Sequence, residues 1–171
     1  MGDIPGNTQA RRQRTWQAGS ERQGEPKGIS QFKAQKMVII DTGPIVAIFD
    51  ESEPMHEKCK SALKEIKKPP LTTWPVLTEA FYLLHDWQKG QRELWSFILA
   101  GGLVIQDIQP ESFPRLRDFM EKYSDRQIDI ADASLIVLAE MHKIKTIFTL
   151  DKKDFSIYKA KHCRNFEIIP R

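Results

Sequence analysis

Residues Met37–Pro44, which read MVIIDTGP, carry the clearest indication of the fold of this chain. Its first four residues are apolar and mostly β-branched, as expected for a short strand that is buried on both faces of a parallel sheet. Pro44 suits the first turn of a helix, and Thr42 or Gly43 would cap that helix. The stretch therefore predicts a buried strand that passes directly into a helix, with Asp41 at the junction.

Apolar runs of strand length alternate with helical patterns over the rest of the chain. We predict further strands at residues 71–73, 103–105, 144–150 and 166–169. We predict helices at residues 42–49, 54–66, 75–87, 110–123 and 130–142, and another that follows a break at Gly90 and ends at Gly101. Asp154 is expected in a turn. This alternation predicts a three-layer α/β/α domain with a mainly parallel central sheet.

The charge divides the chain into two parts. Residues 1–36 carry seven basic and three acidic side chains, which gives +4, whereas residues 37–171 carry 19 basic and 20 acidic side chains, which gives −1. Residues 1–36 have no hydrophobic period and are expected to be disordered. Two interpretations stay open for them: a basic arm that touches nucleic acid, or a leader without function that precedes a true start at Met37. Residues 37–171 form the predicted domain.

The composition makes several classes of protein unlikely candidates for this chain. Its apolar runs are shorter than the roughly 18 residues that a membrane span needs, and its N-terminus has no secretory signal pattern. Cys59 and Cys163 lie far apart in the sequence and fit free thiols in a reducing cytoplasm. The four histidines lack the spacing of zinc ligands. We therefore expect a cytoplasmic protein with no membrane partner.

Acidic residues interrupt the apolar pattern at four places. Asp41 and Asp151 each follow a predicted strand, Asp132 lies in the first turn of the most apolar helix, and Glu79 lies on an apolar helical stripe. Helix capping, turn chemistry or a position at the edge of the stripe would explain each residue alone. Taken together, they could meet at the carboxyl edge of the sheet, where ligands bind. Oxygen ligands favour Mg²⁺ or Mn²⁺, and such a site suits metal-assisted phosphodiester hydrolysis.

Four segments stand in register across residues 37–171: Val38–Pro44, Thr73–Ala80, Asp129–Leu135 and Thr149–Phe155. In order and spacing they resemble the PIN-domain ribonucleases, and more narrowly the VapC-like toxins of toxin–antitoxin pairs. The resemblance implies an α/β/α endoribonuclease that depends on Mg²⁺ or Mn²⁺. It also implies a homodimer and a cognate antitoxin protein that blocks the site. Residues 1–36 are outside the resemblance.

The resemblance also implies roles for individual residues. It maps the acidic set of the family, which would hold one or two metal ions and carry catalysis, onto Asp41, Glu79, Asp132 and Asp151. The ion would activate water for in-line attack on an RNA phosphodiester. Thr42 and Thr149 match hydroxyl positions beside these acids, where they would orient ligands or water. Asp129 is expected to cap its helix and could assist the acidic set.

An acidic site repels RNA, so we expect basic residues to lie near it. Arg126, Lys152 and Lys153 flank the acidic segments and are the candidates for RNA binding, although solvated loop charges would explain them equally well. Aromatic residues in the helices are expected to lie mostly in the core, with some left to form a groove for an antitoxin helix or a second copy of the chain. Two other functions stay open. One is a non-catalytic α/β binding or regulatory domain, and the other is a metal-dependent phosphatase acting on small phosphate esters.

Overall fold

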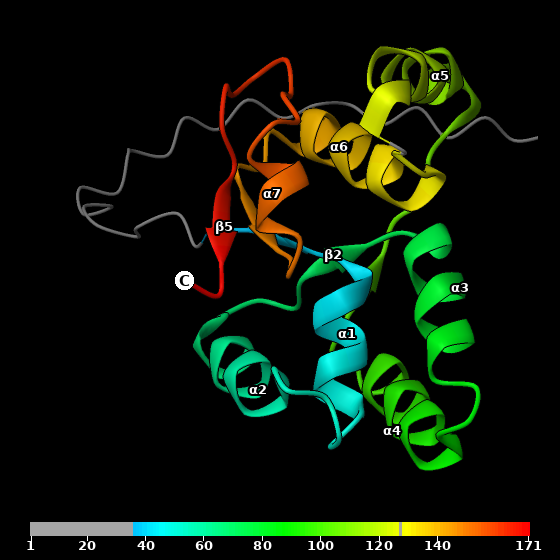
Figure 1. The fold of residues 1–171 in the computed structure, drawn as a ribbon, viewed down its shortest axis with the longest axis vertical. Coiled ribbons are helices and arrows are strands. Elements are labelled where there is room, and N and C mark those ends of the chain that lie inside the picture. Colours follow the sequence, from blue (N-terminus) through cyan, green and yellow to red (C-terminus); the bar gives the residue numbers. More distant parts are fainter. Residues whose placement is uncertain (1–35, 127) are drawn as a thin grey trace, which may run out of the picture. The chain divides into compact units, whose positions relative to one another are not determined.

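The computed structural model describes residues 36–126 and 128–171 of the chain (Figure 1). The segment predicted to be disordered, residues 1–36, lies outside the described residues except for Lys36. The described residues form a five-stranded sheet in the order β3-β2-β1-β4-β5, and every pairing in it is parallel. The strands are β1 (Val38–Ile40), β2 (Leu71–Thr72), β3 (Val104–Ile105), β4 (Thr146–Phe148) and β5 (Glu167–Ile169).

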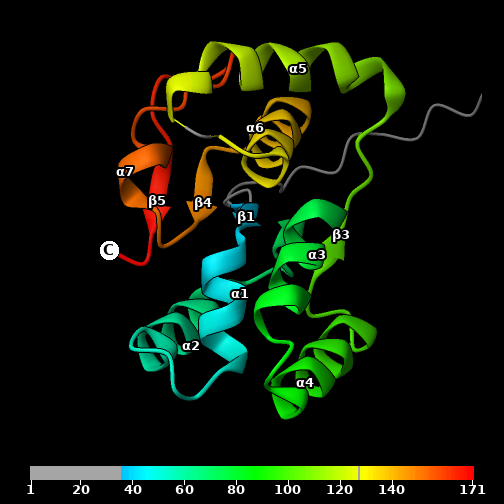
Figure 2. The ribbon, with the colours of Figure 1, turned by 45° about the vertical axis from the view of Figure 1, so that its right-hand side comes forward.

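Helices cover both faces of this sheet, as the predicted three-layer arrangement requires. Figure 2 shows α1, α2 and α4 on one side of the sheet and α5, α6 and α7 on the other. Helix α3 packs against both α1 and α6. The helices are α1 (Thr42–Phe49), α2 (His56–Glu65), α3 (Trp74–Leu83), α4 (Gln88–Leu99), α5 (Phe113–Lys122), α6 (Ile130–His142) and α7 (Lys152–Phe155), with short 3-10 turns η1 (Pro110–Ser112) and η2 (Ser124–Arg126).

The strand order places a switch point beside the central strand. The chain runs from β1 outward through β2 to β3 and then returns to the other side of β1 to form β4 and β5. In open α/β sheets, ligands bind at the carboxyl ends of the strands where the order reverses in this way. Here the reversal lies between β1 and β4, which pair through Ile40 and Phe148. The residues that directly follow these strands are Asp41 and Thr149.

The core lies around β1 and α6. Ile39 and Ile136 are fully buried, and each fully buried side chain of this size contributes ~1.5–3 kcal/mol relative to an exposed one. Helix α6 has the predicted bounds, residues 130–142, and is buried nearly all round from Ala131 to Ala139. None of the helices in the described residues is long and apolar enough to span a membrane.

The prediction that Gly90 breaks a helix is wrong. Gly90 lies inside the first turn of α4, and the break comes earlier, because α3 ends at Leu83. A Cβ atom at Gly90 would stand 2.2 Å from Cδ1 of Trp87 and 2.6 Å from the backbone oxygen of Phe49. Glycine is therefore needed here for the close approach of α4 to the end of α1.

Other element bounds differ in smaller ways. The predicted strand at 144–150 is limited to β4, because only residues 146–148 pair with both neighbouring strands. The predicted helix at 110–123 begins with the 3-10 turn η1 before α5. Asp154 was predicted to lie in a turn, but it lies in α7, because Asp151 caps a short helix at this point.

Candidate functional site

Asp41 joins the end of β1 to the start of α1. Its Oδ1 atom accepts a hydrogen bond of 2.7 Å from the backbone N–H of Thr42, and its Oδ2 atom accepts one of 2.6 Å from Oγ1 of Thr149. Asp41 is therefore the N-cap of α1, and the prediction of Thr42 or Gly43 as the cap is wrong. The helix begins at Thr42, which puts Pro44 at its third position, still within the first turn where proline is tolerated.

Two threonine hydroxyls connect the predicted acids. Thr42 Oγ1 donates a hydrogen bond of 2.7 Å to Oε2 of Glu79, which extends from the middle of α3. Thr149 Oγ1 donates to Asp41 and also accepts a hydrogen bond of 3.0 Å from the backbone N–H of Asp151. Both threonines are buried. They hold the carboxylates of Asp41 and Glu79 in fixed orientations, and Thr149 also anchors the backbone at Asp151.

The start of α6 supplies two more acids. Asp129 caps this helix, as predicted, and its Oδ1 atom accepts a hydrogen bond of 2.8 Å from the backbone N–H of Asp132. Asp132 Oδ2 accepts a hydrogen bond of 3.3 Å from the hydroxyl of Tyr158. Sequence reasoning missed Tyr158, which is fully buried and packs edge-on against Phe155. The apolar spacing of Phe155 and Tyr158, three positions apart just after Asp151, was the available signal.

The electrostatics show that these acids lie close together. Burial, together with the negative charges of Glu79 and Asp129, raises the pKa of Asp41 to about 6, although the hydrogen bonds from Thr149 and Thr42 lower it. Burial likewise raises the pKa of Asp132 to about 8, with contributions from Asp41, Asp129 and Asp151. The structure thus brings the N-cap residues of α1 and α7 together with acids from α3 and α6 into one group with excess negative charge.

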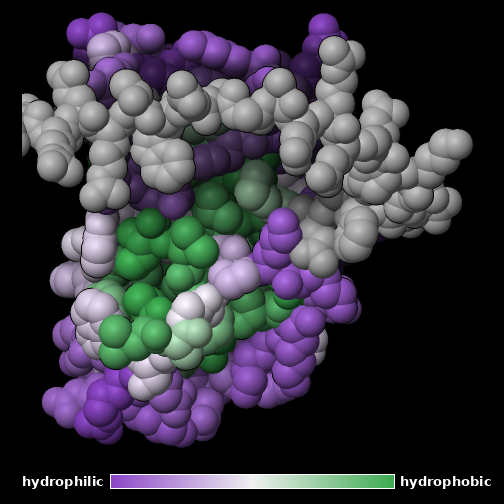
Figure 3. All heavy atoms as spheres, turned by 180° about the vertical axis from the view of Figure 1, so that it is seen from behind, coloured by the Kyte–Doolittle hydropathy of each residue, from purple (hydrophilic) through white to green (hydrophobic). Residues whose placement is uncertain are grey.

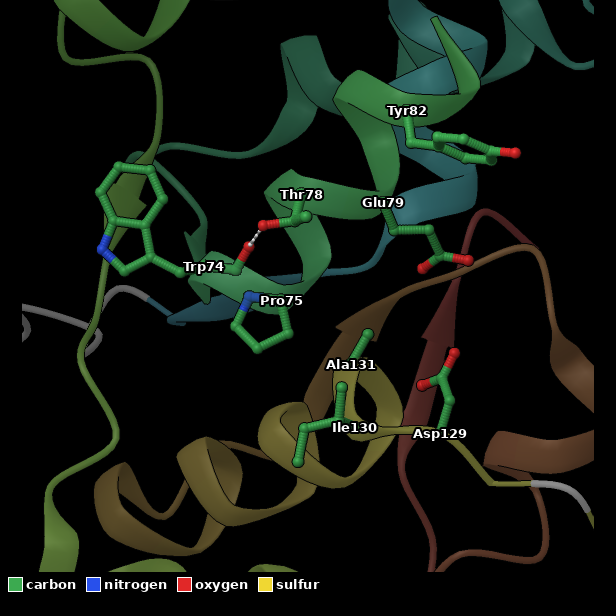
Figure 4. Close-up of a pocket in the computed structure, with 8 residues that line it drawn as sticks. All are labelled: Trp74, Pro75, Thr78, Glu79, Tyr82, Asp129, Ile130 and Ala131. Carbon is green, nitrogen blue, oxygen red and sulfur yellow. Dashed lines mark hydrogen bonds between the residues drawn. The ribbon is translucent and has the colours of Figure 1, made fainter.

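A cavity of about 600 Å³ opens beside this group. Figure 4 shows Glu79 from α3 and Asp129 from the start of α6 facing each other at one side of the cavity. Trp74, Pro75 and Ile130 line the remainder together with neighbouring residues. The cavity therefore combines an acidic side with an apolar side.

The donor set fits a hard divalent cation. Asp41, Glu79, Asp132 and Asp151 offer only carboxylate oxygens, which are the ligands that Mg²⁺ and Mn²⁺ prefer. The raised pKa values of Asp41 and Asp132 reflect burial and negative charge that a bound cation would offset. Within residues 36–126 and 128–171, however, no three His, Cys, Asp or Glu side chains form a ready-made metal centre. A carboxylate oxygen that accepts one hydrogen bond keeps a further lone pair, through which these acids would bind the ion.

The three basic candidates are exposed and lie in two elements. Arg126 ends η2, and Lys152 and Lys153 begin α7. Arg126 and Lys153 are close enough to Asp154 to lower its pKa, although burial and the charge of Asp151 raise that pKa overall. The structure thus places Arg126 and Lys153 at the edge of the acidic group. Lys152 is next to Asp151 in the chain.

Comparison with known proteins identifies the family of the chain. The PIN domain family matches residues 38–161. The chain is 30% identical over 135 residues to Ribonuclease VapC26 of Mycobacterium tuberculosis, covering 78% of this chain and all of that protein. Ribonucleases of the VapC kind generally depend on a divalent metal ion.

Solved structures share the fold. The crystal structure of Mycobacterium tuberculosis VapC20, described as a Sarcin-Ricin loop cleaving toxin, matches with a TM-score of 0.63 and 18% identity, covering 74% of this chain and 98% of that chain. A toxin–antitoxin complex from Klebsiella pneumoniae matches with a TM-score of 0.55 and 18% identity. The match covers 71% of this chain and 91% of the chain from that complex. The family match over residues 38–161 and the 30% identity to Ribonuclease VapC26 show that the chain belongs to the PIN domain family.

Proposed function

We propose that this chain is a metal-dependent endoribonuclease and the toxin of a toxin–antitoxin pair. One observation carries the proposal: acids from four separate elements converge where the strand order reverses between β1 and β4. The similarity to Ribonuclease VapC26, which extends over the whole of that protein, supports RNA as the substrate. The fold shared with a toxin–antitoxin complex supports an antitoxin as partner.

The acidic group would hold Mg²⁺ or Mn²⁺ through Asp41, Glu79, Asp132 and Asp151. When bound, the ion lowers the pKa of water and steadies the charge that develops on the phosphate. Thr42 and Thr149 act as positioning residues, because each donates a hydrogen bond to an acid of the set. Asp129 caps α6 and contributes negative charge to the group.

Arg126, Lys152 and Lys153 would bind the RNA backbone. All three are exposed, and the positive charge of Arg126 and Lys153 acts on Asp154 beside the acidic group. A substrate phosphate at the site would therefore be flanked by cations that offset the repulsion from the acids.

Exposed apolar side chains suit protein partners. Tyr82, Leu83 and Leu99 on α3 and α4 are 71%, 52% and 83% exposed. Figure 3 shows that hydrophobic residues also gather in the middle of the face opposite to that of Figure 1. Large exposed patches of this kind mark interaction sites, and we assign them to a homodimer and to the antitoxin.

Residues 37–171 form the nuclease domain in this proposal, and residues 1–36 are not needed for its chemistry. The toxin would act in the cytoplasm, where RNA is present and where its two cysteines, which are free thiols, stay reduced.

Comparing substrates tests the proposed function against its alternatives. The purified chain should cleave RNA in Mn²⁺ or Mg²⁺, stop in EDTA, and act much more slowly on single-stranded DNA and p-nitrophenyl phosphate. Faster hydrolysis of p-nitrophenyl phosphate than of RNA would instead favour the phosphatase. A chain that cleaves none of them, and whose melting temperature Mn²⁺ does not change, would be the non-catalytic binding domain.

A further inference from the structure

A second cavity, of about 520 Å³, lies beside the one that contains Glu79 and Asp129. The two cavities share Trp74, Pro75 and Ile130 as lining residues. Figure 4 shows the indole of Trp74 pointing away from Glu79 and Asp129, toward the opposite side of α3. The second cavity is therefore a direct neighbour of the acidic site, with Trp74 at the border.

The walls of this second cavity are aromatic and its rim is polar. Trp74 and Phe113 line it and are 50% and 53% exposed. The segment after β3 contributes Gln106, Asp107 and Gln109, whose side chains make no hydrogen bond or ion pair with the described residues. The buried hydroxyls of Thr73 and Ser134 are 2.6 Å apart and also belong to the lining.

Trp74 differs from the other tryptophans in the described ranges. The indole N–H of Trp87 donates a hydrogen bond to the backbone oxygen of Phe49, and Trp95 packs on Phe81 with ring centroids 4.8 Å apart. Trp74 forms neither a ring–ring pair nor an indole hydrogen bond among the residues that the structure places. A half-exposed tryptophan at an acidic cavity, held by no internal contact of this kind, is free to stack on a ligand.

We propose that this second cavity binds one unpaired nucleobase of the RNA, next to the phosphate that is cleaved, with Trp74 as the stacking surface and Asp107 as a reader of the base edge. The proposal rests on the proposed function. Proteins recognise single-stranded RNA by stacking bases on aromatic side chains and hydrogen-bonding the base edges. Trp74 supplies the first contact, and the Gln106–Gln109 segment supplies the second.

The chemistry of the lining favours a base over the sugar–phosphate backbone. No lysine or arginine lines this cavity in the part of the chain that the structure describes, so it offers no charge to a phosphate. Asp107 is an acceptor, and a carboxylate pairs with the amino group of a base. Adenine, cytosine and guanine carry such a group and uracil does not. We therefore expect the cavity to discriminate against uracil.

Binding of short RNA in EDTA tests the stacking contact without cleavage. The probes are fluorescein-labelled A12, C12 and U12 single strands and the A12·U12 duplex, measured by fluorescence anisotropy. Trp74→Leu should weaken binding of A12 and C12 at least about fivefold, as expected for loss of one base–aromatic stack, and Trp74→Phe should restore most of it. The duplex should bind more weakly than A12 and be unaffected by Trp74→Leu.

Trp95→Leu is the matched control, because Trp95 is 47% exposed, on α4, and absent from the lining of both cavities. It should bind A12 like the parent. Thermal unfolding of each variant checks that it is folded. Asp107→Asn should narrow the preference for A12 and C12 over U12, since an amide can donate to the oxygen of uracil.

The proposal is overturned if folded Trp74→Leu binds A12 as tightly as the parent. If the sedimentation coefficient of this variant also changes, Trp74 belongs to a contact between protein chains instead. Mn²⁺-dependent cleavage of RNA by the parent separates the two proposals. If the parent cleaves no RNA but Trp74→Leu still weakens binding of A12, the ribonuclease function is refuted and the base-binding cavity is supported. If the parent cleaves RNA but Trp74→Leu does not weaken binding of A12, only the base-binding cavity is refuted.

Discussion

The hydroxyl of Thr149 donates a hydrogen bond of 2.6 Å to Oδ2 of Asp41, joining two residues 108 positions apart in the chain. The bond connects the carboxyl ends of β1 and β4, which are the two strands on either side of the switch point. It fixes one oxygen of Asp41, while the N–H of Thr42 fixes the other. The orientation of the central acid therefore depends on the start of α1 and on the residue after β4.

Replacing Thr149 by valine should disable the site and keep the fold. The variant loses the donor to Asp41 and the acceptor for the N–H of Asp151. Residues that orient metal ligands typically change activity 10–100-fold when replaced, so we expect a fall of about that size in the rate of RNA cleavage. The control is Thr146→Val within β4, which removes a buried hydroxyl that has no partner among the described residues. Equal cleavage by Thr149→Val and Thr146→Val would contradict the positioning role.

The metal-free protein should lose stability as the pH rises. Burial and neighbouring acids raise the pKa of folded Asp132 to about 8 from an ordinary value of 3.8. The folded state therefore favours the protonated form of Asp132. The stability that this gives is complete below about pH 4, where the unfolded chain is also protonated, and is lost as the pH rises through about 8. Asp132→Asn should remove this fall of the free energy of unfolding with pH. It should also stabilise the protein at pH 8 by at least ~1 kcal/mol, since one pKa unit corresponds to ~1.4 kcal/mol.

Urea unfolding in EDTA at pH 5, 7 and 9 measures this slope. Asp125→Asn is the control, because Asp125 is exposed in η2. Between pH 5 and pH 9, the free energy of unfolding should fall more for the parent than for Asp132→Asn. Equal falls in the two proteins would show that the acids are not crowded.

Gly90→Ala should destabilise the domain. The new methyl group would overlap the ring of Trp87 and the backbone oxygen of Phe49, and overpacking of this kind typically costs about 1–3 kcal/mol. Gly101→Asn is the matched control. Gly101 has a φ of +77°, which asparagine tolerates better than most residues, and nothing lies within 4 Å of its added Cβ. An unchanged midpoint of urea unfolding for Gly90→Ala would refute the close approach of α4 to α1.

Much of the fold followed from local patterns, and the failures have physical reasons. MVIIDTGP predicted β1 and α1, and the apolar run after Asp129 predicted α6 with its cap. The role of Gly90 could not be predicted, because it depends on contacts with Trp87 and Phe49 made only in the fold. The short helix α7 was missed because four residues carry too little periodicity.

The four acids stood out as candidates in the sequence because each one interrupted an apolar pattern. Spacing alone did not show that Thr42 and Thr149 form hydrogen bonds to them, since those bonds join residues 37 and 108 positions apart. Tyr158 was missed altogether, because a buried tyrosine near a helix end has the same pattern as any core residue. Its hydrogen bond to Asp132 becomes visible only in three dimensions.

The basic residues beside the site should govern the salt dependence of RNA binding. Each of these residues, Arg126, Lys152 and Lys153, is replaced by alanine in turn. If the residue contacts a phosphate, the slope of log RNA affinity against log salt concentration should become smaller by about 1. Lys64→Ala on α2 is the control, because Lys64 is exposed and outside the lining of the acidic cavity. Anisotropy of labelled single-stranded RNA in EDTA, from 50 to 300 mM KCl, gives the slopes. Parallel slopes for the parent and all three variants would remove these residues from the RNA site.

The rate of RNA cleavage by Asp41→Asn in Mn²⁺ shows whether the acidic group holds a catalytic metal ion. Asparagine keeps an oxygen that can cap α1 through the N–H of Thr42 and carries no buried charge, so the variant should fold and melt in EDTA at least as high as the parent. It lacks the charge that would help to hold the ion. The folded variant should cleave no RNA above background, and Mn²⁺ should raise its melting temperature less than it raises that of the parent. Cleavage at the parental rate would show that Asp41 does not take part in catalysis.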